Sequence, residues 1–154
     1  MKILVAVDGS PCSEAAVAEV ARRPWPAGSE VRLILADPPT DRSFLRGVPS
    51  DVLNEFLQSQ RAEARQRLDA AAALLTKSAP ALPVVPLLKE GWPKDVILDE
   101  AERWGADLIV VGSHGYGTLK RLFLGSVSLA VATHAPCSVE IVRVKPECAS
   151  SATE

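Results

Sequence analysis

The 154-residue sequence has few cysteines and no excess of basic residues. Its formal net charge of −2 leaves no surplus of Lys and Arg to neutralise the phosphates of a nucleic acid, so we expect no nucleic-acid partner. The three cysteines, Cys12, Cys137 and Cys148, are widely spaced and form no CxxC pair. This pattern argues against a disulfide framework or a zinc site and favours a reducing, cytoplasmic location.

Long hydrophobic runs are also missing. Only about five apolar residues precede Asp8, whereas a membrane span needs roughly 20, so we expect no membrane partner and no targeting segment. Hydrophobic residues nevertheless make up 47% of the chain, which is enough for a core without disulfides or metal. We expect one globular domain over residues 1–145 and a flexible polar tail over 146–154.

Short apolar runs closed by turn residues alternate along the chain with segments of helical spacing. They predict five strands, over residues 3–7, 30–36, 84–88, 107–111 and 138–144. Helices are expected from residue 13 with a serine N-cap, from 50, over 96–104 before a C-capping Gly105, and over 126–133. This alternation predicts an α/β fold: a single-domain, doubly wound sandwich with a five-stranded, mainly parallel sheet and helices on both faces.

The helix from Ser50 has its apolar residues on one stripe, so we expect one face of it to pack on the sheet. Members of the stripe include Leu53, Phe56, Leu57, Ala64, Leu68 and Leu75. Charged residues between 61 and 69 fall largely outside the stripe and are interpreted as solvated surface. The tryptophans are expected to pack helices onto the sheet rather than to stack on a base; they are Trp25, Trp92 and Trp104.

Ligands of such folds bind at the carboxyl ends of strands, where the strand order reverses. The first and fourth strands are the candidates to flank that point, which directs attention to Asp8 and to the loop after the fourth strand. In this loop Gly112 and Gly115 allow a close backbone approach, and Gly125-Ser126 places N–H groups at a helix N-terminus, where anions are favoured. Other groups that could contact phosphates are Thr118, Lys120, Arg121 and Ser128.

The loop fits neither of two common phosphate-binding motifs. No glycine in it is followed by Lys and then Ser or Thr, as a P-loop requires, and Lys120 stands where a Rossmann motif needs its third glycine. The spacing Gly112, Gly115, Gly125, Ser126 resembles the G-x2-G-x9-G-[S/T] signature of the nucleotide-binding universal stress proteins. The stretches 5–10, 105–112 and 135–139 are similar to that family as well.

The resemblance implies an adenine nucleotide alpha hydrolase-like domain with strand order 3-2-1-4-5, which binds ATP, ADP or AMP, with Mg²⁺ or Mn²⁺ bridging the phosphates. It places the adenine near Ala6, Asp8 and Ala36, although Ala36-Asp37 departs from the usual His-Val ending of the second strand. By the same resemblance, the ribose and phosphates are expected to contact Gly112, Ser113, His114, Gly115, Tyr116, Gly117, Thr118, Gly125, Ser126, Val127 and Ser128.

Three functions are compatible with these residues. The resemblance favours a nucleotide-dependent stress-response or regulatory module that forms a homodimer through the last strand, Val139 to Val144. A slow ATPase or another nucleotide-processing enzyme would have to draw on His114, Asp8 or Asp37, but no spacing identifies a partner group, so we assign no catalytic residue and no protein metal ligand. The third function is a dimeric scaffold with a vestigial site.

Overall fold

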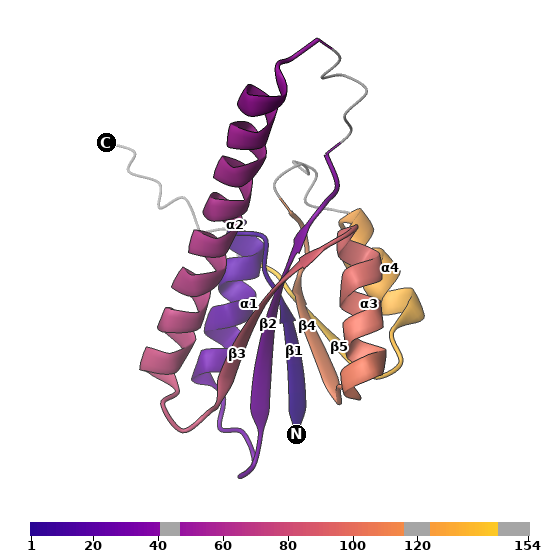
Figure 1. The fold of residues 1–154 in the computed structure, drawn as a ribbon. Coiled ribbons are helices and arrows are strands. Elements are labelled where there is room, and N and C mark those ends of the chain that lie inside the picture. Colours follow the sequence, from indigo (N-terminus) through magenta and orange to yellow (C-terminus); the bar gives the residue numbers. More distant parts are fainter. Residues whose placement is uncertain (41–46, 116–123, 145–154) are drawn as a thin grey trace, which may run out of the picture.

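The computed structural model describes residues 1–40, 47–115 and 124–144, which form four helices and five strands (Figure 1). In chain order these are β1 (Lys2–Ala6), α1 (Pro11–Arg22), β2 (Glu30–Asp37), α2 (Ser50–Ser78), β3 (Val84–Glu90), α3 (Pro93–Trp104), β4 (Leu108–Gly112), α4 (Ser126–His134) and β5 (Ser138–Val142). Within these residues, no helix is both long and apolar enough to cross a membrane. The predicted tail lies outside the described residues and stays a prediction.

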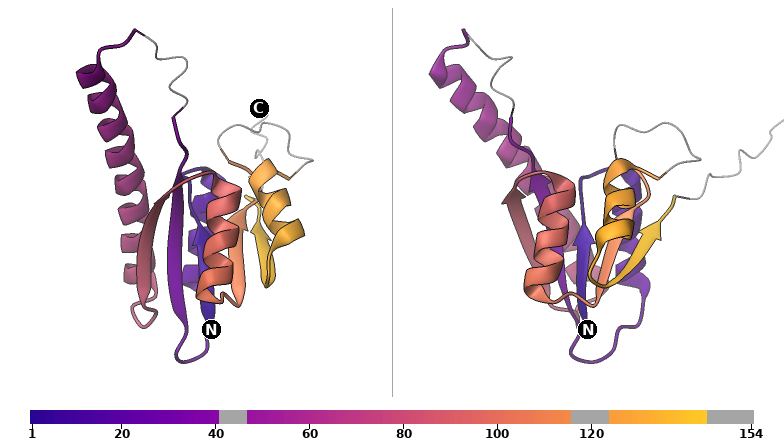
Figure 2. Two further views of the ribbon diagram at one scale, coloured as in Figure 1. Left: turned by 45° about the vertical axis from the view of Figure 1, so that its right-hand side comes forward. Right: turned by 90° about the vertical axis from the view of Figure 1, so that its right-hand side faces the viewer.

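The five strands form one parallel sheet in the order β3-β2-β1-β4-β5, which confirms the predicted fold class and strand order. Central β1 pairs with β2 on one side and with β4 on the other, so Val5 is aligned with both Leu33 and Val110. Helices α1 and α2 cover one face of the sheet, and α3 and α4 cover the other (Figure 2). The strand order therefore reverses between β1 and β4.

Strand β1 is apolar because both of its faces are buried. Ile3, Leu4 and Val5 are each 0% exposed. Successive side chains of a strand point to opposite faces, so Ile3 and Val5 join the core beneath α1 and α2 whereas Leu4 joins the core beneath α3 and α4. The two cores thus meet back to back at this strand.

Helix α1 begins earlier than its apolar spacing predicts. Its N-cap is Ser10, whose Oγ accepts a hydrogen bond from the backbone N–H of Ser13 at 3.3 Å. Pro11 follows in the first turn, where its fixed φ suits a helix and its missing N–H costs nothing. The helix therefore starts three residues after Asp8, close to the end of β1.

The expectation that α2 packs along its whole apolar stripe is wrong for its first half. Ala64, Leu68 and Leu75 are buried, but Phe56 is 49% exposed, and Leu53 and Leu57 are only half-buried. The reason is length, because the 29 residues of α2 span about 44 Å. The eight residues of β2, its longest neighbouring strand, span about 26 Å, so the helix continues past the end of the sheet.

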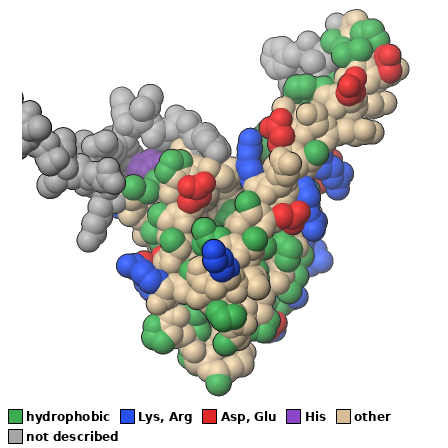
Figure 3. Space-filling model, turned by 90° about the vertical axis from the view of Figure 1, so that its left-hand side faces the viewer, with side chains coloured by type: hydrophobic (Ala, Val, Ile, Leu, Met, Phe, Trp, Pro, Cys, Tyr) green, Lys and Arg blue, Asp and Glu red, His purple; other side chains and the backbone are tan. Residues whose placement is uncertain are grey.

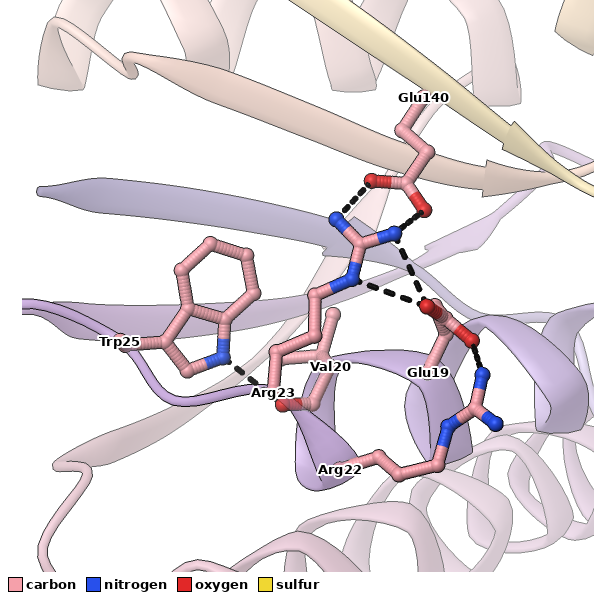
Figure 4. Close-up of polar contacts among 6 residues, drawn as sticks. All are labelled: Glu19, Val20, Arg22, Arg23, Trp25 and Glu140. Atoms are coloured by element: carbon pink, nitrogen blue, oxygen red, sulfur yellow. Dashed lines mark hydrogen bonds and ion pairs between the residues drawn. The ribbon is translucent and has the colours of Figure 1, made fainter.

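A group of charged residues joins the end of α1 to the edge strand β5 (Figure 4). The guanidinium of Arg23 donates to both carboxylate oxygens of Glu140, at 2.7 and 2.6 Å, and also pairs with Glu19. Nearby, Trp25 packs on the core and its Nε1 donates to the carbonyl of Val20 at 2.8 Å. Trp104 is also buried as expected, but Trp92 is 58% exposed, so the packing role expected for it is wrong.

Glu100 of α3 is buried against the sheet and paired with two cations. Its carboxylate accepts from Arg32 Nη1 at 2.5 Å and from Lys89 Nζ, and the Arg32 guanidinium stacks over the Trp104 ring at 4.4 Å. Burial raises the pKa of Glu100, but hydrogen bonds from Lys89 and Arg32 outweigh it and hold the pKa below its usual value. The charged form is therefore the one that stabilises the fold.

We expect Glu100→Gln to lower the free energy of unfolding by about 1.5–3 kcal/mol at neutral pH, since a charge-assisted hydrogen-bond pair is lost. Because the folded-state pKa is depressed, this stabilisation is present above the unfolded-state pKa of about 4.3 and is lost as pH falls through the folded value. Urea titrations at several pH values should show the two proteins converging in acid. Exposed Glu102→Gln is the control, and a difference independent of pH would contradict the assignment.

Candidate functional site

A cavity of about 290 Å³ opens at the carboxyl ends of β1 and β4, where the strand order reverses. Of the predicted site residues that the structure describes, all but one line this cavity: Ala6, Asp8, Ala36, Gly112, His114, Gly115, Gly125, Ser126, Val127 and Ser128. Ser113 does not line it; its side chain is buried and contacts Cys12 and His114. Tyr116, Gly117, Thr118, Lys120 and Arg121 lie outside the described residues, so their roles stay predictions.

The structure adds lining residues that the sequence analysis missed, namely Val7, Ser10, Ser13, Ile34, Pro93, Ile97 and Val111. Ile34 could have been found, because it is two residues before Ala36 on β2 and shares its face. Pro93 and Ile97 come from the start of α3, and no motif marks them. The apolar part of the cavity is therefore mostly a product of packing.

The turn after β1 holds Asp8 at the cavity with one carboxylate oxygen engaged. Asp8 Oδ1 accepts from the backbone N–H of Ser10 at 2.8 Å, and Gly9 takes a φ of 81° that favours glycine. The other oxygen, Oδ2, faces Gly115, where an added Cβ would lie only 2.8 Å from it. Asp8 thus both closes the strand and presents a carboxylate oxygen to the loop after β4.

Gly112, the last residue of β4, packs directly against the start of α1 because it has no side chain. A Cβ at this position would lie 2.6 Å from the carbonyl carbon of Cys12. The Gly112 carbonyl also accepts a hydrogen bond from Ser128 Oγ at 2.7 Å, which fixes the first turn of α4 beside the end of β4. Sequence reasoning gave Gly112 the role of approaching a ligand, and the structure gives it a second role in packing helix on strand.

The N-terminus of α4 faces the cavity. Gly125 is the N-cap, with φ −63° and ψ 156°, and its N–H donates to the carbonyl of Ser113 at 2.8 Å. A glycine N-cap has no side chain to bond the N–H groups of the first turn, which also have no acceptors within the helix. Together with the helix dipole, these N–H groups make this end of the cavity suited to an anion.

His114 is oriented by its neighbours. Ser113 Oγ lies 2.9 Å from His114 Nδ1 and 3.7 Å from Cys12 Sγ, and the Ser113 side chain is buried. The carbonyl of His114 accepts from Ser10 Oγ at 3.3 Å, which joins the loop after β4 to the turn after β1. These contacts hold His114 at the edge of the cavity, and its role toward a ligand stays a prediction.

Two glycines of the site should differ in their tolerance of a methyl group. We expect Gly112→Ala to cost about 3 kcal/mol, the upper end for overpacking, because the new Cβ meets rigid backbone of Cys12. Gly125→Ala should cost about 1 kcal/mol, since its Cβ would lie 3.3 Å from the Ser113 carbonyl and alanine caps helices poorly. Chemical denaturation of both variants tests this, and equal stabilities would contradict the Gly112 contact.

Comparisons with known proteins agree with this geometry. The family model described as the universal stress protein family matches residues 1–143. Universal stress protein Sll1388 of Synechocystis sp. is 38% identical over 61% of this chain, but the match covers only 60% of that relative. A Thermus aquaticus protein, the universal stress protein in QAH/OAS sulfhydrylase 3' region, is 35% identical, and the match covers 92% of this chain and 97% of that protein.

Solved structures show the same fold. Universal stress protein UspA from Lactobacillus plantarum has a TM-score of 0.72 at 28% identity, covering 93% of this chain and 97% of that one. The universal stress protein from Archaeoglobus fulgidus in complex with dAMP has a TM-score of 0.64 at 25% identity, with 92% and 97% covered. On the family match over nearly its whole length, this chain belongs to the universal stress protein family.

Proposed function

We propose that the protein binds an adenine nucleotide in the cavity between β1 and β4 and acts as a nucleotide-dependent stress-response or regulatory module. The observation that carries the proposal is the convergence of Asp8, the glycines of the signature and the N-terminus of α4 on one cavity. A similar protein from Archaeoglobus fulgidus is known in complex with dAMP, which supports the same ligand class here.

The cavity has an apolar part and a polar part, as sites for nucleotides need. Ala6, Ile34, Ala36, Pro93 and Ile97 form the apolar part, which suits the adenine ring. In this arrangement Asp8 accepts a hydrogen bond from the nucleoside. The phosphates lie at the first turn of α4, where free N–H groups and the Ser126 hydroxyl can donate to them.

In this proposal a metal ion is bound by the phosphates of the nucleotide rather than by side chains of the protein. Among the described residues, no group of three His, Cys, Asp or Glu side chains lies close enough to hold a metal ion. Mg²⁺ and Mn²⁺ prefer oxygen ligands and commonly keep phosphate oxygens and water around them. We therefore place the ion on the phosphates of ATP or ADP, and binding of AMP should need no metal.

The thiol groups support a cytoplasmic location within this proposal. Cys12 and Cys137 are both free thiols. Burial raises the pKa of Cys137, and the nearby negative charge of Asp107 adds to this effect, so that side chain stays a neutral thiol at physiological pH. Unpaired thiols of this kind are typical of proteins in a reducing compartment.

Nucleotide binding is tested by denaturing the purified protein, identifying released nucleotide by mass spectrometry, and titrating ATP and AMP by calorimetry. We expect Asp8→Ala and Gly115→Ala to weaken binding by about tenfold or more, or about 1.4 kcal/mol, because the first removes the carboxylate and the second displaces it. Exposed Asp99→Asn is the control. No released nucleotide and no binding of added ATP or AMP would refute the proposal.

We also propose a homodimer that pairs through β5. This strand lies at the edge of the sheet, with β4 on one side, and its apolar Val139 and Ile141 are only half-buried. Such an edge is open to pairing with another strand, and two copies can meet antiparallel across a two-fold axis. Val144 lies just beyond the C-terminal end of β5 and is 49% exposed, so it is available to contact the paired strand of the second copy.

Sedimentation equilibrium tests the β5 dimer. We expect the wild-type mass to exceed that of one chain and Val144→Asp to lower it, since the substitution places a charge beside each pairing strand. Val85→Asp is the matched control, because Val85 is an exposed valine on the opposite edge strand, β3. If Val144→Asp leaves the mass unchanged, the strand is not the interface.

A further inference from the structure

The first half of α2 continues past the sheet (Figure 1), and hydrophobic side chains are exposed on this protruding part of the surface (Figure 3). No residue from 50 to 63 is fully buried, and Val52 and Phe56 are 51% and 49% exposed. An isolated helix shorter than about 12–15 residues is marginal in water, and exposed large apolar residues add a further cost. Leu53 and Leu57 in this part of the helix are half-buried, so Val52 and Phe56 are the large apolar side chains that it leaves exposed among the described residues.

Four residues form a straight stripe along α2: Phe56, Glu63, Arg67 and Leu74. Phe56 and Leu74 are eighteen residues apart, about five whole turns, so they lie directly above one another on the helix. Glu63 and Arg67 fall within about 20° of the same line. All four side chains are exposed, and Arg67 pairs with Glu63 at 3.5 Å.

The stripe is complementary to itself when reversed. Its order along the helix is apolar, acidic, basic, apolar, and the positions are symmetric about residue 65. If a second copy of α2 lies antiparallel across a two-fold axis at that level, Phe56 faces Leu74 of the second copy. In the same register Glu63 faces Arg67 of the second copy, and the symmetry repeats both contacts. Charge complementarity therefore favours another copy of this chain over an unrelated partner.

A groove between α1 and α2 provides the space for this contact. Its volume is about 420 Å³, and its apolar lining includes Val7, Val17, Ala70, Ala71 and Leu74. A phenylalanine buries about 150–250 Å² when it enters such a site. Because Leu74 lines the groove and faces Phe56 of the second copy, that ring would enter the groove.

We propose that this protein self-associates through α2, with Phe56 of each copy seated in the α1–α2 groove of the other and two Glu63–Arg67 pairs between the helices. This interface is separate from β5 and does not depend on nucleotide binding. Val7 and Ser13 line both the groove and the nucleotide cavity, so the inserted ring contacts the back of the turn that holds Asp8. Self-association through α2 would therefore contact residues that line the nucleotide cavity while leaving the cavity itself open.

Charge reversal tests the register. Glu63→Arg and Arg67→Glu should each weaken association by about tenfold or more, because each places like charges opposite one another across the axis. An equimolar mixture of the two variants should regain the wild-type mass, since every charge of one then faces its opposite in the other. The pair within each helix is broken in both variants, so the recovery cannot come from helix stability.

The control is a second ion pair of the same kind on the same helix. Arg65 and Asp69 are also four residues apart and form an ion pair. Arg65 lies about 160° round the helix from Arg67, so this pair is away from the proposed interface. Arg65→Glu and Asp69→Arg should therefore leave the mass unchanged. Phe56→Gln and Leu74→Gln, both at half-exposed positions, should lower the mass without unfolding the chain. Sedimentation equilibrium from micromolar to millimolar protein gives the masses, and circular dichroism checks folding.

Two results would overturn the proposal. One is a mixture of the charge-reversed variants whose mass is no higher than that of either variant alone. The other is that Phe56→Gln and Leu74→Gln both have the same mass as the wild-type protein. Loss of association through Val144→Asp alone, with the α2 variants behaving as wild type, would assign self-association to β5 and also exclude the α2 interface.

Discussion

The contact between Gly112 and the backbone of Cys12 is the constraint on which the rest of the site depends. At this point the end of β4 meets the first turn of α1 with no room for a side chain. The same residue receives Ser128 Oγ through its carbonyl, so one glycine fixes the start of α1 and the start of α4 relative to the central strands. Asp8, His114 and the N–H groups of α4 face a single cavity because these two helix starts are held together.

The cavity combines two kinds of interaction that need different surroundings. Its apolar side comes from β2 and α3, where side chains are packed by the core beneath α3 and α4. Its polar side comes from the Asp8 carboxylate, from serine hydroxyls and from the first turn of α4, whose N–H groups have no acceptor within the helix. An apolar surface beside N–H groups that have no acceptor within the helix suits an anionic ligand with an aromatic ring, such as the proposed nucleotide.

The two edges of the sheet, β3 and β5, have different surroundings. At the β5 edge, Arg23 and Glu140 tie the strand back to α1, which orders an edge that is open to pairing. At the β3 side, α2 covers the strands and then continues beyond them, because a 29-residue helix is longer than the sheet that it packs against. The surplus length exposes Phe56 and carries the self-complementary stripe on which the proposed α2 interface rests.

The sequence alone determined the elements, their order and most of the residues that line the cavity. Apolar runs rich in β-branched residues gave the strands, and the glycine spacing located the loop at which Gly112, Gly115 and Gly125 converge with Asp8. Only the tertiary structure decided that Pro93 and Ile97 line the cavity, that Ser113 is buried and does not line it, and that Phe56 and Trp92 are exposed. Periodicity tells which residues share a face of an element, but whether another element covers that face depends on lengths and packing in three dimensions.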